Sequence, residues 1–353
     1  SKKNSTIEKN MEEALKEAKA LQNQISDIAR KLQEKKQMNW EDKKKLEELM
    51  NHQQELKNKI ENFKNQNNLN NEIRNEFSPP SQEMLNKQQE LEKLMENIMT
   101  PELQKLFDEL QKLMEKMTDK QKIQETLDKL KLSDKDMEKE LDRNLELFKQ
   151  MDVEQRLDNA IKKLDELQKQ QDELSMKTNP DKKSEEKLLN EKKDQIKNQL
   201  DELRRQEEKL KNSGVENKEQ QQALTEKSNE LKKQLEDIKR KIDANKNPQQ
   251  SSEELKKEQE TITEKFNDLK NELKELDKKN RELENPNKLP DMNQLQQQIS
   301  NDQKNSEQQL NQNDKKGSSK SQKGAADKMQ DMQNMMEMVQ QQMSQEQEGE
   351  RSE

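Results

Sequence analysis

Apolar residues recur at alternating intervals of four and three residues near the start of the chain. The series consists of Ile7, Met11, Ala14, Ala18, Leu21, Ile25, Ile28 and Leu32. This alternation places every member on one stripe of an α-helix, which is the seam along which two helices pack. Because a seam occupies only two of every seven positions, paired helices need far fewer apolar residues than a globular core does.

The composition leaves few alternatives to such helices. Only 25% of the 353 residues are hydrophobic, and 41% are charged. Globular domains have nearly twice that apolar share, so the chain is either disordered or built from long helices joined along narrow seams. The regular seams favour helices. We therefore expect an all-α fold of elongated, antiparallel coiled-coil hairpins joined by a compact node of short helices.

A second seam matches the first. Its members are Leu46, Leu49, Leu56, Ile60 and Phe63, and Gln53 occupies the one polar position of the seam. Before it, Asn39 and Asp42 have the spacing typical of a helix N-terminus. Two matched helices with a short connection predict an N-terminal helical hairpin over residues 1–66. Residues 65–77 are rich in Asn and lose the pattern.

Residues 78–151 are the most apolar part of the chain, and their apolar stripe is wider than a seam. A wider stripe indicates more than one packing partner. Helix-start residues recur at Thr100, Thr118, Ser133 and Asp152. We therefore predict a node of several short helices here.

Four more seams of similar length follow. The breaks between them and after them carry turn-forming residues, namely Asn179, Pro180, Gly214, Pro248 and Pro286. We predict two coiled-coil hairpins, over residues 152–213 and 214–286. We predict that residues 287–353 form a weakly ordered tail rich in Gln and Met, with a flexible linker at 314–324.

Acidic residues crowd the stretch 131–151. They are Asp134, Asp136, Glu138, Glu140, Asp142 and Glu146. Such a cluster could hold a hard metal ion or supply paired carboxylates for acid–base catalysis. Alternatively, Ser133 caps a helix and the first acids stabilise its positive end. We favour the second interpretation, because catalytic carboxylates need a desolvated pocket and these alternate with Lys and Arg.

The chain lacks the residue sets of common active sites. There is no Cys, and His52 is the only His, so no catalytic triad or zinc set can form. We expect no enzyme activity, no cofactor and no metal. Acidic and basic residues alternate finely and aromatic residues make up 2%, which argues against nucleic-acid binding. No small-molecule substrate is indicated.

Methionines near the end of the chain are candidates for protein contacts. Together with one valine they form a stripe of Met329, Met332, Met336, Val339 and Met343. Three interpretations are open: a packed core stripe, an adaptable surface for apolar segments of other proteins, or a soft-metal site for Cu(I). Further candidates are Met114 and Met117 in the node, and Trp40 at the first turn, where a local packing role is the simpler interpretation.

One segment carries a family resemblance. Residues 118–175, above all LSDKDMEKELDRNLELFKQ at 132–150, resemble a family of large, uncharacterised Bacteroidetes envelope proteins that are anchored in the inner membrane. The Met/Gln-rich stretch 329–343 is also similar to that family. The resemblance implies a periplasmic segment whose partners are other envelope proteins and whose membrane anchor lies outside this sequence. It implies no active-site residues.

These observations lead to a functional expectation. We expect a non-catalytic scaffold of the bacterial envelope that mediates protein–protein interactions. The alternative is a chaperone-like clasp that holds apolar segments of exported proteins, and a remote alternative is copper binding by the Met-rich tail. A monomer and a homodimer both fit the seams, since hairpins can pair within one chain or between two.

Overall fold

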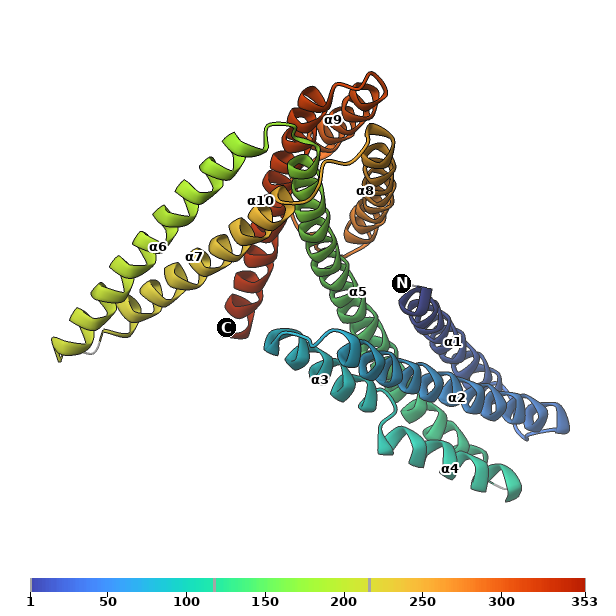
Figure 1. Cartoon of the computed structure of the whole chain (residues 1–353). Helices are drawn as coiled ribbons and strands as arrows, with labels where there is room; N and C mark the ends of the chain where they lie inside the picture. Colours follow the sequence, from blue (N-terminus) through green and yellow to red (C-terminus); the bar gives the residue numbers. More distant parts are fainter. Residues whose placement is uncertain (1, 117–118, 215–216, 353) are drawn as a thin grey trace. The chain divides into compact units, whose positions relative to one another are not determined.

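The computed structural model describes residues 2–116, 119–214 and 217–352 and is all-α over these ranges (Figure 1). The chain forms two compact units. Unit 1 contains Ser1–Gln155 and Lys279–Pro286, and unit 2 contains Arg156–Lys278 and Asn287–Glu353. The all-α prediction is confirmed. Across the described residues, no helix has a stretch both long enough and apolar enough to cross a lipid bilayer.

Unit 1 begins with two long helices that pack side by side, α1 (Lys2–Gln33) and α2 (Trp40–Phe77) (Figure 1). All eight apolar members of the first predicted seam are 5% exposed or less. The predicted helix start is also confirmed, because Asn39 and Asp42 cap α2 reciprocally. The prediction that the pattern ends at 65–77 was wrong, since α2 continues to Phe77 and the next helix starts after Ser81.

Two short helices and the first part of a long one complete the core of unit 1. They are α3 (Gln82–Glu96), α4 (Pro101–Lys116) and α5 (Lys120–Thr178). Thr100 caps α4 as predicted, its hydroxyl accepting a hydrogen bond from the backbone N–H of Leu103. The predicted cap at Thr118 lies outside the described residues.

Helix α5 departs from the predicted node of short helices. The helix starts predicted at Ser133 and Asp152 were wrong, because α5 runs through both without a break. Asp152 takes a different role: its carboxylate accepts a hydrogen bond of 2.7 Å from the side chain of Asn4. A buried polar partner from α1 therefore replaces the local cap that the sequence favours.

That bond belongs to a buried polar network that joins α1, α2 and α5. Asn70 donates to Asn4 at 2.7 Å, Arg74 donates to Asn4 at 3.1 Å and to Gln155, and Asn4 also donates to Gln155. Four of these five residues are 9% exposed or less. Because the groups satisfy one another, the network specifies how the helices pack.

Unit 2 contains the rest of α5 and five further helices. These are α6 (Lys182–Asn212), α7 (Lys218–Asn245), α8 (Ser252–Arg281, within unit 2 as far as Lys278), α9 (Asn293–Asn311) and α10 (Lys315–Ser352). The prediction that residues 152–213 and residues 214–286 each form a hairpin was wrong in the pairing of the helices. The structure pairs α6 with α7 and α9 with α10 (Figure 1). Gly214, after α6, has the left-handed backbone expected of it, with φ of 67°.

A layer of glutamines crosses the core of unit 2. Gln171 of α5, Gln259 of α8, Gln303 of α9 and Gln322 of α10 are all 0% exposed. Gln171 and Gln259 exchange hydrogen bonds of 2.7 and 3.0 Å, and Gln303 donates to Gln171 at 3.2 Å. A polar layer inside apolar seams fixes the register of neighbouring helices at some cost in stability.

The last part of the chain is helical where a linker is predicted. The linker prediction at 314–324 was wrong, because Lys315 already begins α10. The small residues there allow close packing: the hydroxyls of Ser318 and Ser306 are 2.8 Å apart, and a Cβ on Gly324 would lie 3.1 Å from the Asp302 carboxylate. Gly and Ser thus serve helix contact here rather than chain flexibility.

Candidate functional site

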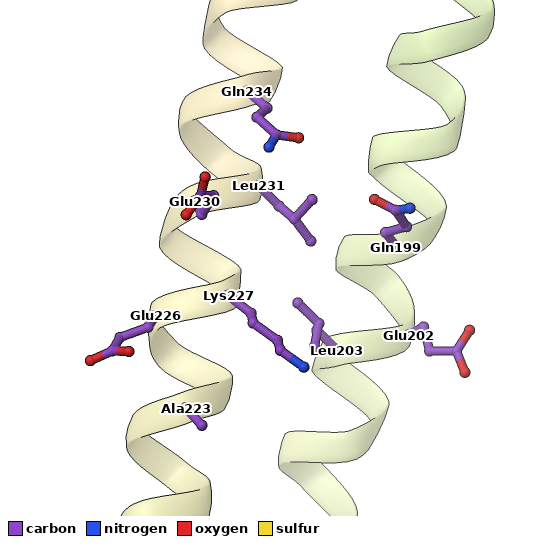
Figure 2. A pocket seen from close by; sticks show the side chains of 9 residues that line it. All are labelled: Gln199, Glu202, Leu203, Ala223, Glu226, Lys227, Glu230, Leu231 and Gln234. Atoms are coloured by element: carbon purple, nitrogen blue, oxygen red, sulfur yellow. The ribbon is translucent and has the colours of Figure 1, made fainter. Parts of the chain in front are cut away.

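A groove runs between α6 and α7 in unit 2 (Figure 2). It has a volume of about 640 Å³ and is lined by Gln199, Glu202, Leu203, Ala223, Glu226, Lys227, Glu230, Leu231 and Gln234. In Figure 2 the side chains of Leu203 and Leu231 point toward the space between the helices, while Glu202 and Glu226 point away from it. The groove therefore has two leucines that face each other, with the Lys227 side chain also extending into the space and acidic side chains at the edges.

The seam of this hairpin is less covered than the seam of α1 and α2. Most of its leucines are only half-buried, namely Leu200, Leu203, Leu210, Leu224, Leu231 and Leu235. A partner helix covers a seam leucine from one side, and further helices are needed to exclude water from the other. The outer part of the α6–α7 hairpin thus leaves an apolar stripe in partial contact with solvent.

Polar residues in the seam explain the opening. The four-three spacing of α6 and α7 continues through Lys193, Glu207 and Ser228, which are half-buried at positions where α1 and α2 carry mostly apolar side chains. Burial of a charged or hydroxyl side chain deep in a seam without a partner costs free energy. The two helices therefore contact each other along an interrupted stripe.

The inner end of the hairpin is closed and apolar. Met176 of α5, Leu189 of α6 and Ala244 of α7 form a small buried cluster, with Ile242 packed against it. The Asn245 side chain of α7 also donates to the backbone oxygen of Lys182, at 3.0 Å. The end of the hairpin near α5 is therefore fixed by packing.

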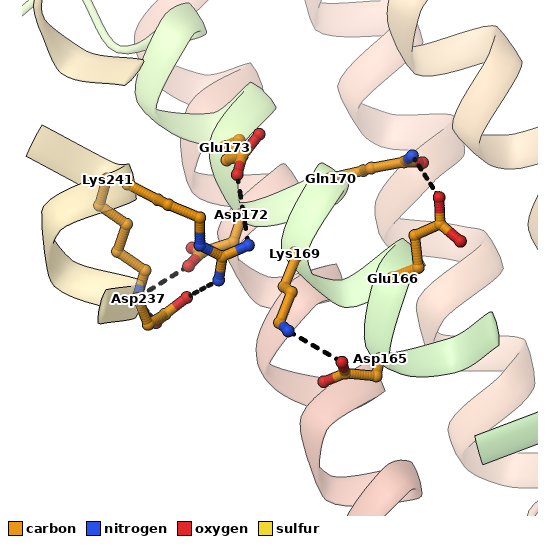
Figure 3. Close-up of polar contacts among 9 residues, drawn as sticks. Asp165, Glu166, Lys169, Gln170, Asp172, Glu173, Asp237 and Lys241 are labelled. Atoms are coloured by element: carbon orange, nitrogen blue, oxygen red, sulfur yellow. Dashed lines mark hydrogen bonds and ion pairs between the residues drawn. The ribbon is translucent and has the colours of Figure 1, made fainter. Parts of the chain in front are cut away.

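Ion pairs add to this anchor (Figure 3). Lys241 of α7 lies 2.8 Å from the carboxylate of Asp172 on α5 and 3.2 Å from Asp237. Burial lowers the pKa of Lys241, but its two carboxylate partners outweigh that effect, so the pKa lies above its ordinary value. Arg240 also lies 3.6 Å from Glu173 of α5. Charge pairing thus holds α7 against α5.

The predicted contact residues are not part of the groove lining, and they belong to different helices: the methionine stripe to α10 of unit 2, Met114 to α4 and Trp40 to α2 of unit 1. The methionine stripe of α10 is buried: Met329, Met332, Met336, Val339 and Met343 are 0–6% exposed. Met114 is buried in the core of unit 1, and Met117 lies outside the described residues. Burial gives the core-packing interpretation of the stripe the stronger support.

Trp40 occupies a different environment from the one predicted. It is 72% exposed at the first position of α2, and the Lys44 ammonium lies 5.6 Å from the centre of its ring. The prediction of a local packing role was therefore wrong. Trp40 stays a candidate for contact with another molecule.

The acidic stretch divides into one buried acid and several on the surface. Asp136 and Asp142 are exposed and Glu138, Glu140 and Glu146 are half-buried, whereas Asp134 is 0% exposed. Burial raises the pKa of Asp134 to about 7, and the neighbouring Glu138 adds to the shift. The interpretation of Asp134 as a helix-end residue was wrong, because it lies inside α5.

Other candidate groups have ordinary structural surroundings. His52 is exposed, and its Nδ1 lies 2.8 Å from the side-chain oxygen of Gln24. Within the described ranges, no group of three or more His, Asp or Glu side chains is placed to hold a metal ion. The α6–α7 groove, with its half-buried leucines, is the feature that we consider as a binding site for another molecule.

Comparison with known proteins adds no relative: no family model, no curated protein and no solved structure matches this chain. The resemblance of residues 118–175 to membrane-anchored envelope proteins therefore stays a prediction. The groove itself was not predicted, although the sequence does carry a signal for it in the polar residues Lys193, Glu207 and Ser228 at seam positions.

Proposed function

We propose that this protein is a non-catalytic helical scaffold that holds an amphipathic helix of a partner protein in the groove between α6 and α7. The observation that carries the proposal is the half-buried leucine seam of this hairpin, which contrasts with the closed seam of α1 and α2. A third helix laid along the groove would complete the burial of that seam. Docking of an amphipathic helix into an apolar groove is a common mode of protein recognition.

The charges of the groove specify the partner further. Glu202, Glu226 and Glu230 line it together with one cation, Lys227. The lining therefore carries a net charge of −2, from three acids and one base. A partner helix with an apolar stripe flanked by Lys or Arg complements this edge, and such complementarity guides orientation and speeds association.

The affinity of one such contact is expected to be modest. Complete burial of a leucine stabilises by roughly 1.5–3 kcal/mol. The seam leucines already have most of their surface covered, so each adds at most about 1 kcal/mol. The free energy of binding is therefore the sum of several such contributions along the hairpin. This fits a scaffold that assembles reversibly with its partners.

The cellular setting of the proposal rests on the resemblance of residues 118–175. We place the scaffold in the bacterial envelope, as the periplasmic segment of a protein anchored in the inner membrane, with other envelope proteins as partners. A chaperone-like clasp is the second candidate, because half-buried leucines can also accept an unfolded apolar segment. Burial of the α10 methionines removes the adaptable surface that this alternative first invoked.

The test uses a defined helix as the probe. A fluorescent synthetic peptide with a leucine seam flanked by lysines is titrated against the full chain, and its anisotropy is followed. We expect saturable binding that weakens about tenfold, or about 1.4 kcal/mol, when Leu203→Gln and Leu231→Gln are combined. Leu188→Gln is the matched control, because Leu188 is 40% exposed on α6 and lies outside the groove lining.

Two further arms separate the alternatives. A peptide with the same seam flanked by glutamates should bind more weakly, because it meets Glu226 and Glu230. A clasp should also suppress aggregation of an unrelated unfolding protein, whereas the scaffold should not. Equal binding by the wild type and the Leu203/Leu231 variant would overturn the proposal, as would a dimer of the chain that these substitutions dissociate.

A further inference from the structure

A carboxyl group occupies a seam position in α5. The seam of this part of the helix consists of Ile123, Leu127, Leu130, Asp134, Met137 and Leu141, spaced by four and three. Its apolar members are 3% exposed or less, and Asp134 is 0% exposed. Among the residues that the structure describes, neither carboxyl oxygen of Asp134 has a hydrogen-bond partner. An ionised carboxylate in such a place is strongly disfavoured.

The charged groups around Asp134 do not neutralise it. On its own helix, Glu138 one turn away is the charged neighbour that acts on it, and it repels a second negative charge. On α4, which shares the same core, every charged side chain from Glu102 to Lys116 is exposed. The buried charged groups of the other helices that share this core have partners of their own: Lys87 of α3 pairs with Glu154, Asp42 of α2 with Lys35, and Glu8 of α1 with Lys279. The neutral, protonated carboxyl is therefore the form that fits the closed core.

The local sequence is also suited to a different structure. Ser133 is a favourable helix N-cap, and Asp136 stands three residues later, where an acid can bond back to the cap. If a helix began at Ser133, Asp134 would be its first residue, where negative charge is stabilised by the helix dipole. Leu132 is 68% exposed in the continuous helix, so it loses no core contact if the helix opens beside it.

We propose that α5 has two states, continuous through residue 134 while the Asp134 carboxyl is protonated, and interrupted at Ser133 when it is ionised. In the interrupted state the charge leaves the seam for a solvated helix N-terminus. The pattern Ser133-Asp134-Lys135-Asp136 is then a latent helix start that core packing suppresses. In the continuous helix the Asp134 carboxyl has a pKa of about 7, so it ionises near neutral pH.

Spin labelling tests this directly. The chain has no Cys, so Lys122→Cys and Lys139→Cys place two labels at exposed positions on either side of Ser133. A continuous helix sets them about 26 Å apart at 1.5 Å per residue. About two pH units below the Asp134 pKa of about 7, we expect a single narrow distance between the two labels. About two units above it, we expect a second, shifted or broadened distance.

Two variants distinguish the effect of the Asp134 charge from general effects of pH on the protein. Asp134→Asn cannot ionise, so its distance should stay narrow at both pH values. Ser133→Ala removes the latent cap, so the second distance should be less populated in the alkaline sample. A wild-type distance that does not change with pH would overturn the proposal, and so would an Asp134→Asn variant that changes as the wild type does.

Discussion

Replacement of Asp134 should stabilise unit 1 in a pH-dependent way. Its pKa of about 7 exceeds the ordinary value of 3.8 by about three units. At about 1.4 kcal/mol per unit, ionising the buried group costs up to about 4 kcal/mol of folding free energy. If α5 is interrupted at Ser133, the Asp134 charge reaches solvent and part of this cost disappears. The measured gain in stability of Asp134→Asn is then smaller.

The sign follows from proton binding. The folded state binds the Asp134 proton more tightly than the unfolded state does, so the penalty is absent below about pH 4. It grows as the pH rises from about 4 to about 7 and is complete above that range. The free energy of unfolding of Asp134→Asn, relative to the wild type, should therefore rise across this window and then stay constant. Asp134→Leu should gain further stability, because leucine packs in the seam.

The assay is denaturant unfolding followed by circular dichroism at 222 nm, at several pH values. Fluorescence is less suitable, because Trp40 is already 72% exposed in the folded state. The difference between wild type and Asp134→Asn cancels the titration of all other groups. A difference that does not depend on pH between 4 and 8 would refute the reasoning.

Three other predictions concern unit 2. Met332→Ala should cost about 2–5 kcal/mol, because Met332 is 0% exposed, whereas Met338→Ala at 61% exposure should cost little; thermal unfolding compares them. Similar losses would contradict a buried stripe. Gln171→Leu should destabilise by about 1–3 kcal/mol, because the side-chain oxygen of Gln259 on α8 loses its donor and the side-chain N–H of Gln303 on α9 loses its acceptor. Denaturant unfolding measures it, and an unchanged midpoint would argue against the polar layer. Lys241→Met should destabilise and Asp172→Asn in the same chain should recover part of the loss, and additive effects in a double-mutant cycle would exclude the ion pair.

Local and periodic signals predicted much of the fold. The seam of α1 and the second seam through Phe63 are buried as the four-three spacing requires. The cap at Asn39 and the left-handed Gly214 follow from backbone chemistry that acts within a few residues. Such features depend on neighbours in the sequence, which is why they can be read from it.

Long-range packing decided the features that were predicted wrongly. Ser133 and Asp152 have the chemistry of helix starts, yet α5 runs through both, because burial of its seam outweighs a local cap. Gly317 and Gly324 have the composition of a linker, yet they lie in α10 beside α9. In both cases the deciding contacts come from residues far away in the sequence.

The candidate groove was missed for a related reason. The leucines of α6 and α7 were recognised as seams, and a seam alone does not indicate how many helices cover it. Polar residues such as Glu207 and Ser228 at seam positions carry that information. They mark the stretch of α6 and α7 where the seam is only half-buried.

Cysteine accessibility tests the central claim, which is that the seam of α6 and α7 is open while that of α1 and α2 is closed. Single variants Leu231→Cys and Ala18→Cys are treated with a maleimide in native buffer, and their labelling rates are divided by the rates in denaturant. Ala18 is 0% exposed and Leu231 is half-buried in the groove lining. We predict labelling at 231 only moderately slower than the denatured rate, and labelling at 18 slower by orders of magnitude. Equal protection of the two positions would contradict the claim.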